Sequence, residues 1–250
     1  MSSGKSFSEL ERRLRPYETA YDFCVPAGNQ LVVRLDGRGF TRLTRDVWQF
    51  QAPLDERCRD LMAATTARLM QCGFNVLYGY SQSDEISLLL HPDDDTFGRK
   101  TRKIISVLAA EASATFTHGL GNPATFDARV CILPTEALVL DYFRWRQEDA
   151  HRNTLNGHCY WLLRGQGLDV PTATARVAAL KRSDKHELLF QSGTNFIDLP
   201  TWQKRGFGLY WRRDETARPQ RQLHTDWEIP FAADYDAFLR RLLRQKILAG

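Results

Sequence analysis

The stretch Phe74-Asn-Val-Leu-Tyr-Gly-Tyr-Ser-Gln-Ser-Asp-Glu-Ile-Ser-Leu-Leu-Leu90 contains two apolar runs on either side of a short polar segment. Residues 74–80 and 86–90 are rich in aromatic and aliphatic side chains, which favour strands. The segment between them, residues 81–85, ends in Asp84 and Glu85. The stretch therefore predicts a β-hairpin whose turn carries two adjacent acids.

The elements on either side of this hairpin predict the fold. Before it, a buried strand at residues 30–35 is followed by a helix from Leu54 to Cys72, with Pro53 at its start and Gly73 at its end. After it, a helix over 99–118 with helical apolar spacing is followed by a strand at 126–133. The order β-α-β-β-α-β predicts an α+β, ferredoxin-like split βαβ fold, with an antiparallel sheet and its helices on one face, as in polymerase palm domains.

The second half of the chain predicts additions to this core. Thr135 is a suitable N-cap for a long helix that reaches about Arg164, and a short helix is expected over 171–180. Further expectations are two strands, near residues 188–190 and 206–213, and a terminal helix over 234–248. We expect a palm-like core at residues 1–135 and the additions at 136–250, together forming one compact unit.

Composition excludes several classes of protein. The chain has 250 residues, of which 43% are hydrophobic and 26% charged, so it is not a disordered chain. Its 5 cysteines are too sparse for a disulfide scaffold, and we expect free thiols. No apolar run is long enough for a membrane span and no signal peptide is evident, which predicts a cytoplasmic protein.

The net charge of +4 is unevenly distributed. Residues 201–250 hold 10 Lys and Arg against 6 Asp and Glu, so this segment carries the whole excess. Arg240, Arg241, Arg244 and Lys246 follow one side of the predicted terminal helix. Such a row predicts contact with a phosphate backbone.

The acids fall where the predicted sheet brings strand ends together. Asp36 follows the first strand and Asp84 lies in the hairpin turn, so their carboxylates are expected to converge. Either acid alone is as readily explained by turn formation. Together they predict a divalent cation, and hard oxygen ligands without His or Cys indicate Mg²⁺. A Mg²⁺ site in a palm-type sheet is typical of two-metal nucleotidyl transfer.

Six motifs then occur in the order found in one enzyme family. They are Val33-Arg-Leu-Asp-Gly-Arg-Gly-Phe40, Tyr80-Ser-Gln-Ser-Asp-Glu85, Phe126-Asp-Ala-Arg129, Trp145-Arg-Gln-Glu-Asp-Ala-His-Arg-Asn153, Asp184-Lys-His-Glu-Leu-Leu-Phe190 and Gly193-Thr-Asn-Phe196. Over residues 21–215 the chain resembles the tRNA-His guanylyltransferase family, and within it the shorter prokaryotic relatives.

The resemblance implies a reaction and its participants. Members extend nucleic acid in the 3′-to-5′ direction: the 5′ end of a tRNA is activated by ATP or by an existing triphosphate, and the 3′-hydroxyl of an incoming nucleotide attacks it. GTP is the favoured nucleotide in guanosine addition, whereas the prokaryotic relatives tend to repair truncated 5′ ends against a template. Two Mg²⁺ ions, a tRNA acceptor stem and a homotetramer are the implied partners.

The resemblance also implies roles for particular residues. Asp36, Asp84 and the carbonyl of Gly37 match metal ligands, and Glu85 and His151 match further catalytic positions. The positions that match nucleotide-binding residues are Arg38, Gly39, Phe40, Ser83, Arg129, Asn153, Lys185 and Asn195.

Two positions depart from the family pattern. Ala52 stands where a Lys usually precedes the proline, and Thr154 stands where a second Asn is common. The first change removes a cation expected near phosphate, for which Arg42 or Arg45 is the candidate substitute. These departures put nucleotide preference and the activation route in question.

Two other functions remain as alternatives at this point. Palm-type nucleotide cyclases share the split βαβ core, but their hairpin carries paired glycines, whereas residues 81–85 read Ser-Gln-Ser-Asp-Glu. A tRNA-binding protein without activity is the other alternative, and the presence of both Asp36 and Asp84 argues against it.

Overall fold

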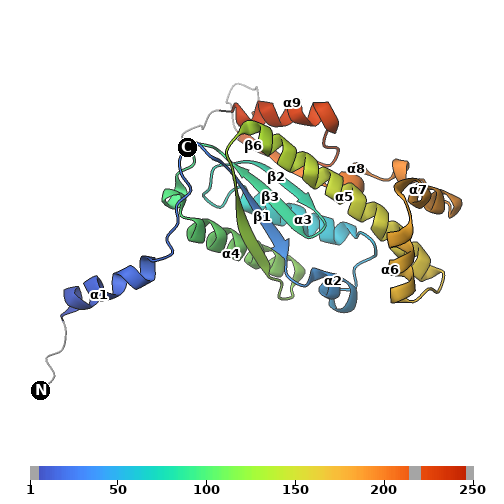
Figure 1. The fold of residues 1–250 in the computed structure, drawn as a ribbon, viewed down its shortest axis with the longest axis horizontal. Coiled ribbons are helices and arrows are strands. Elements are labelled where there is room, and N and C mark those ends of the chain that lie inside the picture. Colours follow the sequence, from blue (N-terminus) through green and yellow to red (C-terminus); the bar gives the residue numbers. More distant parts are fainter. Residues whose placement is uncertain (1–5, 214–220, 246–250) are drawn as a thin grey trace, which may run out of the picture.

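Six strands form a single antiparallel sheet at the centre of the computed structural model, which describes residues 6–213 and 221–245. The strand order is β4-β1-β3-β2-β5-β6, and the first four strands have the predicted split βαβ arrangement (Figure 1). β5 and β6 extend the sheet beyond β2. The strands are β1 (Gln30–Gly37), β2 (Val76–Gln82), β3 (Glu85–Leu90), β4 (Phe126–Leu133), β5 (Phe207–Arg213) and β6 (Arg221–Asp226).

Helices α3 (Glu56–Leu69) and α4 (Thr101–Leu120) cover one face of the sheet. Their apolar faces and alternate strand residues form the larger core, which includes Leu35, Leu88 and Phe116. α3 begins after Pro53 rather than at it, because the side chain of Asp55 caps the helix by accepting from the backbone N–H of Arg57.

The opposite face of the sheet is also covered, so the expectation of helices on one face is wrong for the whole molecule. The long helix α5 (Glu136–Gly165) and α9 (Ala232–Leu243) lie over it (Figure 1). Val32, Leu77 and Leu89 point to this side and form a second core with these helices. The central strands are apolar on both faces, which is the pattern of a sheet buried between two layers.

A smaller lobe packs against the C-terminal half of α5. It contains α6 (Val170–Ala179), α7 (Arg182–Gln191), a 3-10 turn η3 (Phe196–Asp198) and α8 (Thr201–Arg205). Residues 188–190 belong to α7, so the strand predicted there is wrong: Leu189 is buried in a helical cluster with Leu155 and Phe196, whereas Phe190 is exposed.

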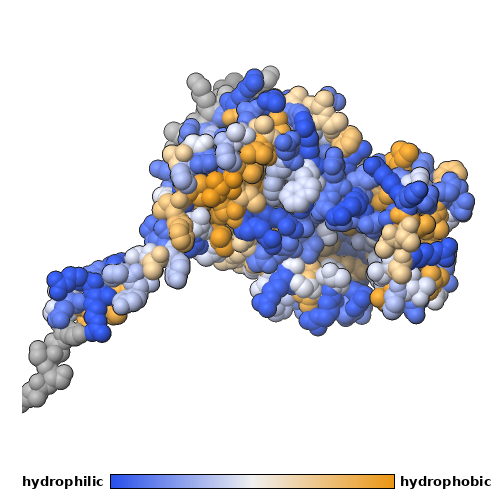
Figure 2. Space-filling model, viewed as in Figure 1, coloured by the Kyte–Doolittle hydropathy of each residue, from blue (hydrophilic) through white to orange (hydrophobic). Residues whose placement is uncertain are grey.

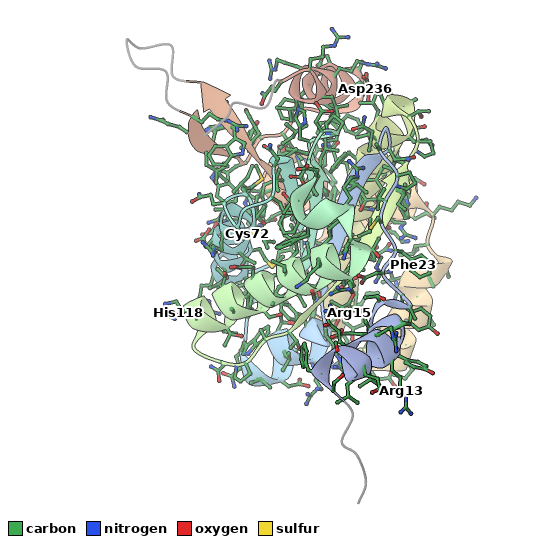
Figure 3. All side chains as sticks on the ribbon, turned by 90° about the vertical axis from the view of Figure 1, so that its left-hand side faces the viewer. Arg13, Arg15, Phe23, Cys72, His118 and Asp236 are labelled. Carbon is green, nitrogen blue, oxygen red and sulfur yellow. The ribbon has the colours of Figure 1, made fainter. Side chains whose placement is uncertain are left out.

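The N-terminal helix α1 (Phe7–Thr19) buries none of its residues and projects from the body (Figures 1 and 2). In Figure 3 the side from which α1 projects faces the viewer, with Arg13 and Arg15 on α1 in front of the body and Asp236 on α9 at the top of the view. Contact with the body resumes after α1, where Asp22 accepts a hydrogen bond from Lys100 at 3.0 Å.

Shorter elements complete the described chain. α2 (Phe40–Arg42) and a π-helical turn η1 (Leu43–Val47) follow β1, and η2 (Thr96–Arg99) precedes α4. The five cysteines are free thiols, as predicted. No helix in the described residues has the length and apolarity needed to cross a bilayer. Lys246 and the predicted end of the last helix at Leu248 lie outside the described residues.

Candidate active site

The end of β1 and the β2–β3 turn lie side by side, which brings the predicted acids together. Asp36 is the cross-strand partner of Glu85, and the backbone N–H of Gly37 donates to the carbonyl of Asp84 at 3.0 Å. On its other side Asp36 pairs with Asp127 of β4. The sheet register and the β2–β3 turn therefore place Asp36 next to Asp84, Glu85 and Asp127 at one end of the strands.

Two backbone positions shape this end of the strands. A Cβ atom at Gly37 would lie 2.5 Å from the ring of Phe40, so only glycine fits where the chain turns under that ring. The hairpin loop contains two residues, and its first residue, Ser83, has a positive φ of 51°. This turn places Asp84 beside β1 rather than out in solvent.

The negative charges of Asp36 and Asp84 repel each other. Burial, followed by the charge of Asp36, raises the pKa of Asp84 to about 6. Burial is also the main cause that raises the pKa of Asp36, against the opposing effect of Arg34. Both carboxylates are thus costly to ionise, and a bound cation relieves that cost.

The donor set fits Mg²⁺. The described residues contain no group of three or more His, Cys, Asp or Glu side chains that could hold a metal ion, so a closed all-protein site is absent from this part of the chain. Mg²⁺ is commonly held by one or two carboxylates and completes its shell with water and substrate phosphates. Two neighbouring aspartates match that chemistry. Cys58 also lines the adjacent cavity, but burial, followed by the charge of Asp84, raises the pKa of its thiol to about 12, so it is not a thiolate ligand at pH 7.

Glu85 is held by two arginines. Its Oε1 accepts from Nη2 of Arg34, its Oε2 accepts from Nε of Arg34 at 3.2 Å, and Oε2 also accepts from Nη1 of Arg146 at 3.2 Å. Nη2 of Arg34 also donates to Oδ2 of Asp36 at 2.8 Å. Glu85 is therefore already neutralised by guanidinium groups, unlike Asp84.

A cavity of about 610 Å³ opens beside Asp84. Its size matches that of small-molecule sites. Of the predicted residues, Phe40, Ser83, Asp84 and Asn153 line it. The rest of the wall is partly aromatic, and it comes from the loop after β1, from α5, from α8 and from β5: Phe50, Tyr160, Trp161, Trp202 and Phe207.

The cavity also clarifies the two departures from the family pattern. Ala52 lines it, and so does Arg45, whereas Arg42 does not. Arg45 is exposed and pairs with its neighbour Asp46 at 2.6 Å. Thr154 is buried, and its hydroxyl donates to the carbonyl of Gln203 at 2.7 Å, which ties α5 to α8.

His151 belongs to a second group of residues, in the lobe. Its ring packs on Phe196 with 5.2 Å between centroids and lies near His186, and its Nε2 is 3.3 Å from Nη2 of Arg182. Burial, followed by the charges of Arg182 and Arg205, lowers the pKa of His151 to about 4, so the ring is neutral at pH 7.

Three further predicted residues, Lys185, Asn195 and Arg129, do not line this cavity. Lys185 is half-buried on α7, and Asn195 caps η3, donating to Asp198 at 2.8 Å. Arg129 is exposed on β4, where it lies 3.6 Å from Asp127. Phe40 is 2% exposed and packs in an aromatic core with Trp48, so it supports the cavity from behind.

Sequence reasoning missed Arg34 and Arg146. Arg34 was detectable, because it lies two residues before Asp36 on a strand and so on the same face of the sheet. Arg146 comes from α5, and no local pattern marks the position of that helix over the sheet. The aromatic residues Tyr160 and Trp161 were missed for the same reason.

Comparison with known proteins gives consistent results. The family model described as tRNAHis guanylyltransferase matches residues 11–134, and the Thg1 C terminal domain model matches residues 137–231. The probable tRNA(His) guanylyltransferase of Homo sapiens is 31% identical over 228 residues, covering 86% of this chain and 75% of that protein. The tRNA(His) guanylyltransferase of Neurospora crassa is 32% identical over 202 residues, covering 76% and 68%.

Solved structures are similar over nearly the whole chain. A bacterial tRNA(His) guanylyltransferase-like protein in complex with GTP has a TM-score of 0.77 and 28% identity, covering 94% of this chain and 99% of that one. A structure of such a protein in complex with ATP has a TM-score of 0.76 and 27% identity, covering 94% and 100%.

Proposed function

Because the chain belongs to the tRNAHis guanylyltransferase family and is a 3′-to-5′ nucleotidyltransferase of that family, we propose that Asp36 and Asp84 form its catalytic centre. The substrates are a nucleoside triphosphate and the 5′ end of a tRNA. The observation that carries the proposal is that two carboxylates with raised pKa values lie next to each other and that one of them, Asp84, lines a cavity of about 610 Å³. The family match favours this function over the two alternatives, a nucleotide cyclase and an inactive tRNA-binding protein.

Asp36, Asp84 and the carbonyl oxygen of Gly37 would hold the two Mg²⁺ ions. Bound Mg²⁺ neutralises the charge that develops on the transferred phosphoryl group and on the attacking oxygen. The two acids supply the negative charge that retains the ions. In the metal-free protein burial is the main cause that raises the pKa of both acids, and the charge of Asp36 raises the pKa of Asp84 further.

The cavity beside Asp84 takes the incoming nucleotide, with GTP favoured. Its aromatic walls suit a base, and base–aromatic stacking stabilises binding by about 1–3 kcal/mol per base. Ser83 and Asn153 present a hydroxyl and an amide at the cavity wall, and Arg45 adds a cation. Proteins similar to this chain have been solved with GTP and with ATP, which supports GTP for addition and ATP for activation.

The reaction joins the 3′-oxygen of the incoming nucleotide to the phosphorus at the activated 5′ end of the tRNA. The bond to the leaving group, pyrophosphate or AMP, breaks as the new ester forms, and the hydroxyl proton passes to solvent or a basic side chain. Cations near the leaving group stabilise its charge. Arg182, Arg205 and Lys204, around His151, supply such charges from the lobe, and Lys185 lies on α7 of the same lobe.

Assembly is part of the proposal. The acceptor stem of the tRNA lies along the lobe, and four copies of the chain assemble. α1 buries nothing against its own chain, which leaves its surface available to a neighbouring copy.

Product analysis on 5′-labelled tRNA tests the function. The wild-type protein should extend 5′-monophosphorylated tRNA with ATP and GTP, or 5′-triphosphorylated tRNA with GTP alone. Asp84→Asn should lower the rate by about 100-fold or more, as expected for loss of an electrostatic catalytic group. tRNA binding should change little.

Asp127→Asn is the matched control, because Asp127 lies across from Asp36 but its side chain is 62% exposed. This variant should keep its rate within a few-fold of wild type. Absence of extension by the wild-type protein on either tRNA, or equal loss in both variants, would overturn the assignment.

A further inference from the structure

Arg34 is shared between two carboxylates in an unequal way. We propose that Glu85 is a positioning residue that holds the Arg34 guanidinium and so keeps one oxygen of Asp36 available to a metal ion. The inference rests on the proposed function, since it concerns the metal-binding acid Asp36. It assigns Glu85 a role distinct from that of its neighbour Asp84.

The geometry of the guanidinium shows the inequality. Its Nε and Nη2 atoms, which form one planar fork, both donate to the carboxylate of Glu85. Asp36 shares only Nη2, through Oδ2 at 2.8 Å. No hydrogen bond between described residues reaches Oδ1 of Asp36. The bidentate pair, the stronger of the two arrangements, is therefore made with Glu85.

Arg146 fixes Glu85 from the other side. Its side chain is 4% exposed, its Nη1 donates to Oε2 of Glu85 at 3.2 Å, and its Nη2 lies 3.4 Å from Asp149. The Trp145 ring lies over its guanidinium at 3.7 Å. Because Arg146 and Asp149 belong to α5, this chain of charges also ties the long helix to the acid edge of the sheet.

Removal of Glu85 should redirect Arg34. A guanidinium without its fork partner has Asp36 as the nearest carboxylate, and a fork-to-fork pair would occupy both oxygens that the metal needs. Groups that orient metal ligands typically change metal affinity by about 10–100-fold when removed. We therefore expect the affinity for the metal to fall when Glu85 is removed, although Glu85 itself binds no metal.

Mn²⁺ binding, followed by electron paramagnetic resonance on the full chain without tRNA, tests this directly. Glu85→Gln should weaken Mn²⁺ binding by about tenfold or more. The double variant Arg34→Gln/Glu85→Gln should recover most of that affinity, because the competing guanidinium is gone. Asp149→Asn is the control: it removes a carboxylate from the same charge chain without touching Arg34, and should bind Mn²⁺ as the wild type does.

The double variant separates positioning from simple damage. A structural defect in Glu85→Gln would be deepened, not rescued, by the second substitution, and circular dichroism melting of each variant checks the fold. Unchanged Mn²⁺ affinity in Glu85→Gln, or no recovery in the double variant, would overturn the inference. A wild-type protein that binds no Mn²⁺ would instead overturn the proposed metal site.

Discussion

At the residue scale, the neighbouring aspartates Asp36, on β1, and Asp84, in the β2–β3 turn, have different surroundings. Asp36 shares the Arg34 guanidinium with Glu85, whereas Asp84 accepts a hydrogen bond from the Ser83 hydroxyl at 3.1 Å. Burial, followed by the charge of Asp36, raises the pKa of Asp84 to about 6, although the Ser83 hydrogen bond acts to lower it. Asp84 is the residue whose ionisation depends most on a bound cation.

The pH dependence of stability should report this carboxylate. A carboxyl with a folded-state pKa of about 6, against 3.8 in the unfolded chain, binds its proton more tightly when folded. Its contribution is therefore fully present below pH 3.8 and is lost as pH rises through 6. In metal-free protein this loss should be about 1–3 kcal/mol, measured by urea unfolding at pH 4 and 7.

Asp84→Asn should remove this part of the pH dependence, because the amide does not ionise. Saturating Mg²⁺ should also reduce it in the wild type. An identical stability profile in Asp84→Asn and wild type, without metal, would show that Asp84 titrates normally.

The meeting of Asp36 and Asp84 was predictable, since both lie at the ends of strands that the split βαβ order makes neighbours. The arginines around Glu85 were harder to predict. Arg146 reaches Glu85 only because α5 crosses the second face of the sheet, and that packing depends on tertiary contacts rather than on local sequence.

At the element scale, strongly periodic segments were predicted well. β4 has the expected bounds, and Thr135 caps α5, accepting from the N–H of Leu138 at 3.3 Å. α7 was mistaken in part for a strand, because a short apolar run such as 188–190 has no distinguishing period. β6 was missed because it is a polar edge strand, half-buried through pairing with β5.

The junction of α8 and β5 depends on Gly206. This residue has φ 81° and ψ −169°, a region open almost only to glycine. A Cβ atom there would also lie 2.4 Å from the carbonyl oxygen of Ser81, on β2. The glycine thus allows β5 to approach β2 next to the hairpin that carries Asp84.

Gly206→Ala should destabilise the protein by about 3 kcal/mol or more, since backbone strain and a clash with fixed backbone add. Gly121→Ala is the matched control: Gly121 also has a positive φ, 74°, but a Cβ there would meet nothing within 4 Å. Its cost should be about 1 kcal/mol. Equal losses in the two variants, measured by urea unfolding, would contradict the role of the clash.

At the scale of the whole molecule, one sheet serves two cores. α3 and α4 complete the first, as the order of elements predicted, and α5 and α9 complete the second. The second layer was not expected, although the apolar runs of β1, β2 and β3 on both faces are its signal. α1 takes part in neither core.

Deletion of residues 1–19 should therefore leave the fold intact. Because α1 buries no residue, the free energy of unfolding should change by less than about 0.5 kcal/mol, the range of ordinary surface changes. The deletion keeps Asp22, which pairs with Lys100 and Arg102. Urea unfolding at several protein concentrations provides the measurement, and a loss above about 2 kcal/mol would contradict an independent α1.

The order of the cavity walls along the chain has a consequence during translation. Asp36 and Asp84 emerge early from the ribosome, whereas Asn153, Trp202 and Phe207, which close the cavity, emerge much later. At about 5–20 residues per second, the interval is on the order of ten seconds. A chain that ends before α5 carries both acids but lacks Asn153, Trp202 and Phe207, so the cavity wall is completed only late in synthesis.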